Sequence, residues 1–194
     1  VYEFIDGQPG SAISIQKNDV VALVEFLKEV GECSRMPAFA SRPIASDACF
    51  SLMEYFGTVD RRLKQLERVV EFSDFKQCEL DTFLQNQFKP VFSDAKNRSR
   101  ELPNLNLRLS ASETILSPSD HGFHNAIKRA DGRWVFIDFE YAGWDDPAKA
   151  VADACLHPGV PIPRPFQDTF VKQILDLWDR DGQLKDRLRV VYPL

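Results

Sequence analysis

A hairpin pattern between residues 126 and 138 constrains this chain more than any other feature. Two short apolar runs, Ala126-Ile127 and Trp134–Ile137, flank Asp131-Gly132, a pair typical of a two-residue hairpin turn. Asp138 follows the return strand directly. The pattern therefore predicts a small antiparallel sheet that ends in a carboxylate.

A polar loop precedes this hairpin and follows the apolar run Ile115-Leu116. It carries Asp120 and, five positions later, Asn125, so we expect both to meet Asp138 at one edge of the sheet. Such a trio suits phosphoryl transfer, because a carboxylate can accept the proton of a substrate hydroxyl while an amide oxygen and a second carboxylate hold Mg²⁺ against nucleotide phosphates. We expect Asp120 to be the base and Asn125 and Asp138 the metal ligands. The alternative is that all three are turn and cap residues.

The segment resembles the catalytic segment of the aminoglycoside phosphotransferase and choline kinase group, relatives of the protein kinases. That group has an Asp, an Asn five residues later, a hairpin, and then Ile-Asp-Phe/Trp-Glu and Ala-Gly-x-x-Asp-Pro. The positions that match in register are Asp120, Asn125, Asp138, Glu140, Ala142, Gly143, Asp146 and Pro147. Pro118-Ser119 stands where the group usually has His-Gly, so support for that backbone must come from another residue.

The resemblance implies an α+β, mostly helical fold: the carboxy-terminal lobe of a kinase-like protein, with the site in residues 115–153 on a small β-hairpin. It also implies ATP or GTP as phosphate donor, with Mg²⁺. Residues 46–92 resemble the helical subdomain that binds the acceptor. Further supporting roles fall on His124 beside Asp120, Glu140 as a second metal or substrate ligand, Asp146 as a helix cap, and Asp153 as a brace for the catalytic loop.

The amino-terminal residues 1–10 look like the hinge between two kinase lobes. The alternating run Val1–Gly7 begins in mid-strand, and the resemblance implies that the backbone of Glu3, Phe4 and Ile5 touches adenine. An ordinary edge strand is the alternative. Neither a glycine-rich phosphate loop nor its lysine is recognisable, so we expect residues 11–194 to be one lobe of a longer kinase and the fragment alone to be inactive.

Apolar spacing predicts a series of helices around this segment. The first runs from Asn18 or Asp19 to Val30, where Gly31 stops it; a second starts at the cap Ser46 and is interrupted by Gly57. Others cover residues 58–70, a stretch after Ser73 that Pro90 ends, a helix capped by Asp146 and stopped by His157, residues 167–178, and the tail 184–194.

Composition excludes several classes of function. The net charge is −5 and no run of Lys and Arg supplies a basic face, which argues against nucleic-acid binding. No apolar run approaches the ~20 residues that cross a bilayer, so no membrane partner is expected. Cys33, Cys49, Cys78 and Cys155 form no Cys-x-x-Cys pair and predict free thiols in a reducing cytoplasm.

Two hypotheses of different classes remain. The first is an ATP-dependent kinase that phosphorylates a hydroxyl of a small molecule such as an aminoglycoside, choline or a sugar-like compound. The second is a non-catalytic binding or scaffolding domain, favoured by Pro118-Ser119. A metal hydrolase built on His121, His124 and Asp138 fails on spacing. The sequence does not indicate an oligomeric state.

Overall fold

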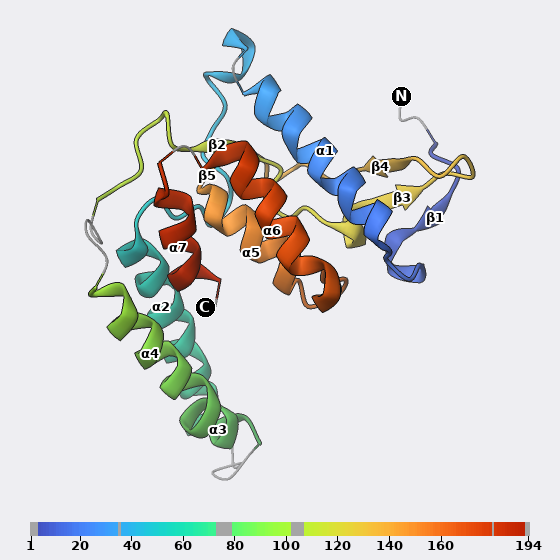
Figure 1. The fold of residues 1–194 in the computed structure, drawn as a ribbon. Helices are drawn as coiled ribbons and strands as arrows, with labels where there is room; N and C mark the ends of the chain where they lie inside the picture. The colour runs from blue at the N-terminus through green and yellow to red at the C-terminus, as the bar shows by residue number, and fades with distance from the viewer. Residues whose placement is uncertain (1–3, 35, 73–78, 102–106, 180, 193–194) are drawn as a thin grey trace.

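The computed structural model describes residues 4–34, 36–72, 79–101, 107–179 and 181–192 of the 194-residue chain (Figure 1). Its described part is an α+β fold dominated by helices, as predicted. The strands are β1 (Gln8–Pro9), β2 (Ile115–Ser117), β3 (Ala126–Lys128), β4 (Trp134–Phe136) and β5 (Gly143–Asp145). The α-helices are α1 (Lys17–Cys33), α2 (Leu52–Phe72), α3 (Glu79–Phe83), α4 (Lys89–Ser99), α5 (Pro147–Leu156), α6 (Arg164–Trp178) and α7 (Gln183–Val191), with a π-helical turn at Leu84–Phe88.

The core lies where α1, α5, α6 and α7 pack against one another (Figure 1). In α1 the apolar residues Val20, Leu23, Val24 and Leu27 are buried, which confirms the face predicted from their helical spacing. Asp146 caps α5 by accepting the backbone N–H of Ala148, as expected for an Asp-Pro start. The apolar face of α5 then completes the core beneath the sheets.

Two small antiparallel sheets carry the loops. One has the order β1-β3-β4, and the other pairs β2 with β5. The predicted β3–β4 hairpin is confirmed, but the two-residue turn is wrong. Gly132 has φ 86° while Asp131 is not in the left-handed region, and the N–H of Arg129 donates to the carbonyl of Arg133 at 2.8 Å. The loop therefore holds three residues, and Gly132 supplies the one left-handed position that such a loop needs.

Glycine does not end either helix in which a boundary was predicted at it. Gly57 lies inside a continuous α2, and a Cβ there would meet nothing within 4 Å, so the helix continues at a cost of about 1 kcal/mol relative to alanine. Gly31 lies inside α1, which runs to Cys33; a Cβ at Gly31 would be 3.3 Å from Nε1 of Trp178. Gly31 therefore permits close packing of α1 against α6.

The cap of α2 was also misplaced. Ser46 precedes a stretch without helix, and α2 begins at Leu52. Ser51 accepts the N–H of Glu54 at 3.2 Å, and the Glu54 carboxylate accepts the N–H of Phe50 at 2.7 Å. Ser51 thereby satisfies one free donor of the first turn, which Ser46 is too far away to do, and Glu54 fixes the chain just before the helix.

Pro90 does not end its helix either. It lies in the first turn of α4, which continues to Ser99. A proline in a continuous helix removes an N–H and clashes with the carbonyl four residues before it. The π-helical turn at Leu84–Phe88 widens the chain at this point, and the N–H of Lys89 donates to the carbonyl of Leu84, five residues back. The predicted start after Ser73, and Cys78, lie outside the described residues.

The amino-terminal strand is shorter than predicted and lies further along the chain, at Gln8–Pro9. Residues 4–6 form no strand, and Phe4 is 87% exposed. Pairing falls instead on Gln8–Pro9, which lie opposite Lys128 and Ile127 of β3. The flanking glycines allow this close approach, since a Cβ on Gly10 would be only 2.0 Å from the carbonyl oxygen of Phe123.

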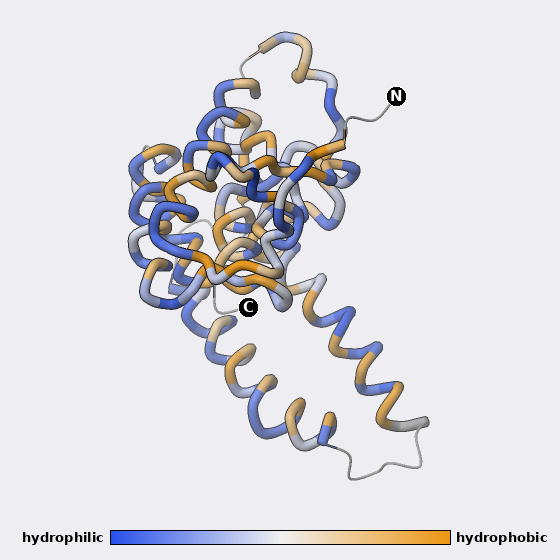
Figure 2. Tube along the Cα trace, turned by 90° about the vertical axis from the view of Figure 1, so that its right-hand side faces the viewer, coloured by the Kyte–Doolittle hydropathy of each residue, from blue (hydrophilic) through white to orange (hydrophobic). Residues whose placement is uncertain are grey.

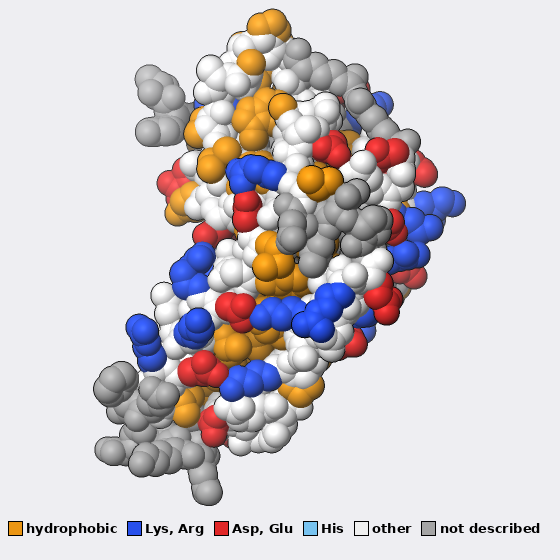
Figure 3. All heavy atoms as spheres, turned by 90° about the vertical axis from the view of Figure 1, so that its left-hand side faces the viewer, with side chains coloured by type: hydrophobic (Ala, Val, Ile, Leu, Met, Phe, Trp, Pro, Cys, Tyr) orange, Lys and Arg blue, Asp and Glu red, His pale blue; other side chains and the backbone are white. Residues whose placement is uncertain are grey.

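The helices α2, α3 and α4 form a hairpin that extends away from the core, clearly seen in Figures 1 and 2. Lys96 bridges to Asp60 at 2.8 Å and Lys89 to Glu67 at 2.7 Å, so ion pairs link α4 to α2. Figure 3 shows side chains of both charge signs interspersed with apolar ones on this side of the molecule. Its base packs against α7, since both α2 and α4 contact that helix.

Two further features of composition have structural counterparts. Cys33, Cys49 and Cys155 are free, and the last two are buried. Within the described ranges, none of the helices combines the length and the apolar character that a bilayer crossing requires.

Candidate active site

The loop that follows β2 is fixed by hydrogen bonds around Ser119. This residue has φ 65°, a left-handed conformation that costs a non-glycine residue energy. Its N–H donates to Oγ of Ser117 at 3.0 Å, and its carbonyl accepts the backbone N–H of His121 at 2.8 Å. Nδ1 of His121 also lies 2.8 Å from that carbonyl, so Nδ1 carries the proton and donates it. The loop therefore presents Asp120 from a constrained backbone.

His121 is buried and does not reach a substrate. Its side chain is 2% exposed, and burial lowers the pKa of its imidazole, which keeps the ring neutral. Its ring is bonded to the Ser119 carbonyl and makes no hydrogen bond to Asp120. It stabilises the backbone next to Asp120, the kind of support that Pro118-Ser119 had left in question.

Asp120 and Asn125 are directly linked. The Asp120 side chain is 49% exposed. The amide nitrogen of Asn125 donates to the backbone carbonyl of Asp120 at 2.8 Å and lies 3.4 Å from its Oδ2. Phe123, between them in the chain, is fully buried against Trp134 at a ring distance of 5.0 Å. The buried ring anchors the loop while the two polar side chains face outward.

Asp138 lies next to Asn125 through the backbone. The N–H of Ile137 donates to the carbonyl of Asn125 at 2.9 Å, and Asp138 follows with φ 66° and an exposed side chain. The charges of both carboxylates, those of Asp120 and Asp138, also act on the phenol of Tyr141. A hydrogen bond with Glu140 raises the pKa of the Tyr141 phenol, and the charges of Asp138 and Asp120 act in the same direction. Both carboxylates are therefore near enough to Tyr141 for their charges to act on its phenol.

The other predicted residues are spread more widely. Glu3 lies outside the described residues, Phe4 is exposed, and Ile5 is half-buried. Glu140 is an exposed partner of Tyr141. Asp146 is fully buried: it receives hydrogen bonds from the hydroxyl of Tyr55 at 3.0 Å and from Arg187. Its surroundings are those of a structural residue.

Asp153 lies on α5 and lines the hollow in front of Asp120. Its carboxylate pairs with Lys149 at 2.6 Å. It also acts on the buried His121 ring, whose pKa its charge raises against the larger lowering effect of burial. A direct brace to the catalytic loop, as the resemblance implied, remains a prediction.

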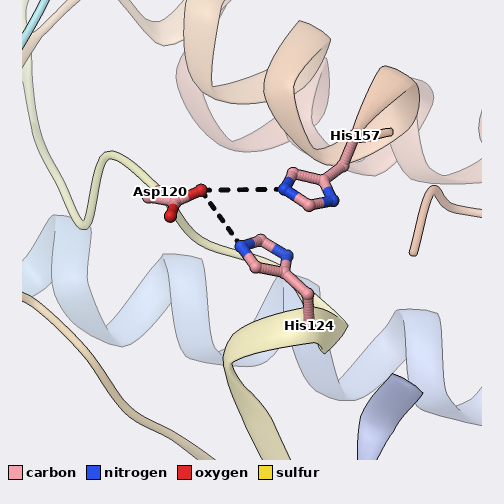
Figure 4. A group of neighbouring side chains, drawn as sticks. All are labelled: Asp120, His124 and His157. Carbon is pink, nitrogen blue, oxygen red and sulfur yellow. Dashed lines mark hydrogen bonds and ion pairs between the residues drawn. The ribbon is translucent and has the colours of Figure 1, made fainter. Parts of the chain in front are cut away.

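His157 is a residue that the sequence did not assign to the site. It was predicted only to stop α5, and it does form the C-cap of that helix. Its Nε2 lies 3.8 Å from Oδ1 of Asp120, and Nε2 of His124 lies 3.0 Å from the same oxygen (Figure 4). The two imidazoles are stacked at 3.5 Å with a 5° angle between their planes. No local pattern reveals this contact, because only tertiary packing brings α5 to the loop.

A hollow of about 790 Å³ opens in front of Asp120. The start of α2, the loop that carries Asp120, and α5 surround it; its walls include Tyr55, Arg62, Asp120, Asp153 and His157. Arg62 is paired with Asp47 at 2.8 Å. A second hollow of about 570 Å³, between α1, α6 and α7, contains none of the predicted catalytic or metal-binding residues. The first is therefore the one in which a reacting group can approach Asp120.

The fold of the described residues is similar to that of solved structures of a spectinomycin phosphotransferase. Spectinomycin phosphotransferase APH(9)-Ia in its AMP complex superposes with a TM-score of 0.63 at 13% identity, over 97% of this chain and 57% of that chain. The same enzyme with ADP and spectinomycin gives a TM-score of 0.60 at 13% identity, over 97% and 54%. No protein-family model and no curated protein matches the sequence.

At this identity the similarity shows the fold, and it confirms the kinase-like architecture expected from residues 120–147. The chain spans a little over half of the length of the structures that it matches.

Proposed function

We propose that this chain belongs to a phosphotransferase that moves the γ-phosphoryl group of ATP or GTP to a hydroxyl of a small molecule, such as an aminoglycoside, choline or a sugar-like compound. One observation carries the proposal: an exposed Asp120 at a hollow, hydrogen-bonded by Asn125, whose own carbonyl is bonded to the residue before Asp138. The fold supports it, since the matched structures are of a kinase acting on a small molecule.

Asp120 takes the role of the base. Its carboxylate accepts the proton of the acceptor hydroxyl and orients that oxygen, and its partly exposed position at the hollow suits both tasks. His124 holds one carboxylate oxygen, Oδ1, at 3.0 Å. The base is therefore held in one orientation before any substrate arrives.

Asn125 and Asp138 fit a magnesium site by the chemistry of their donors. The amide nitrogen of Asn125 is used on Asp120, which leaves its oxygen for a cation, and Asp138 offers an exposed carboxylate. Hard oxygen ligands of this kind are those that Mg²⁺ takes. When bound, the ion would neutralise charge on the nucleotide phosphates. Asp120 and the metal ligands would then face the same reacting group from one loop and one strand end.

The remaining assignments carry over the expectations drawn from the sequence. We assign acceptor binding to residues 46–92, because the first half of α2 lines the hollow, and adenine contact to the backbone of residues 3–5 at the hinge-like segment 1–10. We keep supporting roles at the site for His124, Glu140 and Asp153. Asp146 supports the site only by stabilising the fold. The free thiols fit a cytoplasmic protein. Activity is assigned to the complete translated protein, since the matched structures are nearly twice as long.

Isothermal calorimetry with ATP, with and without Mg²⁺, tests the proposal in the complete translated protein. Wild type should bind nucleotide in a Mg²⁺-dependent manner, and Asp138→Asn should lose most of that dependence. Asp168→Asn, at an exposed position of α6, is the matched control and should bind as wild type does. Nucleotide binding that is equally strong without Mg²⁺, or unaffected by Asp138→Asn, would contradict the metal assignment.

Turnover then separates binding from catalysis. Asp120→Asn should keep nucleotide affinity and lower phosphoryl transfer by about 10²- to 10⁴-fold, the usual contribution of a general base. Pro118-Ser119 favours the second hypothesis, a non-catalytic binding domain. That hypothesis predicts the opposite pattern: a folded protein that neither binds Mg²⁺-ATP nor changes when Asp120 is replaced.

A further inference from the structure

His157 is placed to meet a substrate at the catalytic base. It lies at the end of α5 and lines the same hollow as Asp120. Figure 4 shows the rings of His124 and His157 lying one over the other, each with a nitrogen directed at the Asp120 carboxylate. His124 is within hydrogen-bond distance of Oδ1, at 3.0 Å, whereas Nε2 of His157 is 3.8 Å away, too far for a direct hydrogen bond.

The backbone fixes the tautomer of His157. Its Nδ1 accepts the N–H of Gly159 at 3.0 Å and the N–H of Val160 at 3.2 Å. A ring nitrogen that accepts two N–H groups carries no proton, so the proton of the neutral ring is on Nε2. Burial and the neighbouring His124 lower the pKa of His157, which favours the neutral ring. Nε2 is therefore a hydrogen-bond donor aimed at the space beside Asp120.

The same tautomer argues against a metal site at this cluster. Asp120, His124 and His157 each offer a ligand atom, and these atoms all lie within 4.8 Å of one another. A metal needs the lone pair of Nε2, which is free only when the proton moves to Nδ1. That move would leave the N–H groups of Gly159 and Val160 without their acceptor. The cluster is thus built to donate to an oxygen atom.

We propose that Nε2–H of His157 and Oδ1 of Asp120 hold one hydroxyl oxygen of the acceptor between them. This inference rests on the proposed function. Two atoms 3.8 Å apart can both lie about 2.8 Å from a single bridging oxygen, which is a normal hydrogen-bond length. The hydroxyl donates its hydrogen to the carboxylate and accepts the N–H of the imidazole. An ammonium group cannot accept from Nε2–H, so the pair selects an alcohol over a protonated amine.

The transfer of the proton and of the phosphoryl group needs no reactant besides the acceptor, the nucleotide and Asp120. The O–H bond of the acceptor breaks and its proton goes to Asp120, while the oxygen forms a bond to the γ-phosphorus. The bond from that phosphorus to the β,γ-bridging oxygen breaks, and the nucleoside diphosphate leaves with the electron pair. His157 keeps its proton throughout, so its contribution is binding and orientation of the oxygen.

Hydrolysis of ATP with no added acceptor tests this, because water is the smallest hydroxyl that can occupy the position. The measurement uses the complete translated protein with Mg²⁺-ATP. His157→Phe keeps a ring for stacking and removes the donor, so the rate should fall about tenfold, as for one lost hydrogen bond. His157→Gln supplies an N–H near the position of Nε2 and should retain most of the rate. Lys185→Gln, exposed on α7, is the control.

Calorimetry with Mg²⁺-ATP should give the same affinity for wild type and both His157 variants, because the residue acts on the acceptor. Equal rates in wild type and His157→Phe would overturn the assignment, as would a rate for His157→Gln as low as that of His157→Phe. A wild type that binds nucleotide but hydrolyses none also counts against it. A wild type that binds no Mg²⁺-ATP refutes the proposed function itself, and the assignment falls with it.

Two measurements without turnover examine the chemistry of His157 directly. Nitrogen-15 NMR of histidine-labelled protein should show the proton on Nε2; a proton on Nδ1 would overturn the donor role. Titration with Zn²⁺ should give no tight 1:1 binding that depends on His157. Zinc binding in wild type that is lost in His157→Phe would identify the cluster as a metal site and refute the proposal.

Discussion

The side-chain nitrogen of Asn125 lies 2.8 Å from the backbone carbonyl oxygen of Asp120. This bond ties together the two ends of the loop between β2 and β3. It also decides which atom of Asn125 faces away from the loop, because the amide nitrogen is used and the oxygen is left. An amide at this position can therefore brace the loop and serve a cation at the same time.

A carboxylate at position 125 should be harmful although it is a stronger ligand for Mg²⁺. In Asn125→Asp no N–H remains for the Asp120 carbonyl, and two oxygens are forced together. We expect a loss of about 1–2 kcal/mol in the free energy of unfolding, at least as large as that of Asn125→Ala. Urea unfolding of both variants measures it. A variant Asn125→Asp as stable as wild type would show that the loop does not need this bond.

Gly10 supports the same loop from the amino-terminal side. A Cβ there would lie 2.0 Å from the carbonyl oxygen of Phe123, which is backbone and cannot turn away. Gly10→Ala should lower the free energy of unfolding by about 2–3 kcal/mol, as overpacking does. Gly57→Ala is the matched control: its Cβ would meet nothing within 4 Å, so it should stabilise α2 by up to about 1 kcal/mol. Similar effects in urea unfolding would contradict this account.

Some helix boundaries could be predicted from the sequence and others could not. Apolar spacing located α1, and Asp146-Pro147 located the start of α5, because both are set by contacts within a few residues. A glycine that ends a helix and one that is tolerated inside it look alike in a local pattern, so the sequence did not distinguish the two at Gly57. Pro90 misled for the same reason, since the chain absorbs it in a π-helical turn.

The residues of the candidate site likewise include some that the sequence predicts and some that it does not. Asp120, Asn125 and Asp138 could be predicted as a group because one loop and one hairpin relate them, and their order along the chain carries the signal. His157 was missed because it reaches Asp120 only through the packing of α5 beside the loop. The role of His121 was also hidden, since the bond between its ring and the Ser119 carbonyl depends on a left-handed turn that serine rarely adopts.

Asp146 is expected to act on stability and not on chemistry. It is fully buried and receives hydrogen bonds from Tyr55, Arg187 and the N–H of Ala148. Asp146→Ala leaves the Arg187 charge buried without its partner and should cost about 3–5 kcal/mol. Tyr55→Phe removes one hydrogen bond and should cost about 1 kcal/mol. Asp176→Ala, exposed on α6, is the control in the same urea unfolding series. An Asp146→Ala protein as stable as the control would refute the structural role.

Asp145 makes the fold depend on pH. Its side chain is fully buried; Oδ1 accepts the N–H of Asp146 at 2.8 Å, and Oδ2 makes no hydrogen bond within the described residues. Burial raises the pKa of Asp145 to about 6, against the opposing charge of Lys149, whose Nζ lies 3.5 Å away. An unfolded aspartate titrates near 3.9. Between these two values the folded protein holds a proton that the unfolded chain has released.

Stability from this group is therefore greatest at low pH and falls as pH rises from about 4 to 6, with no further change above. Between pH 5 and pH 7 the loss should be about 1 kcal/mol. Asp145→Asn cannot titrate, so its free energy of unfolding should fall less over that interval. Lys149→Met removes the charge that opposes the shift and should make the fall steeper. Urea unfolding of the three proteins at both pH values tests this; parallel pH profiles for wild type and Asp145→Asn would show that the buried carboxyl is ionised throughout.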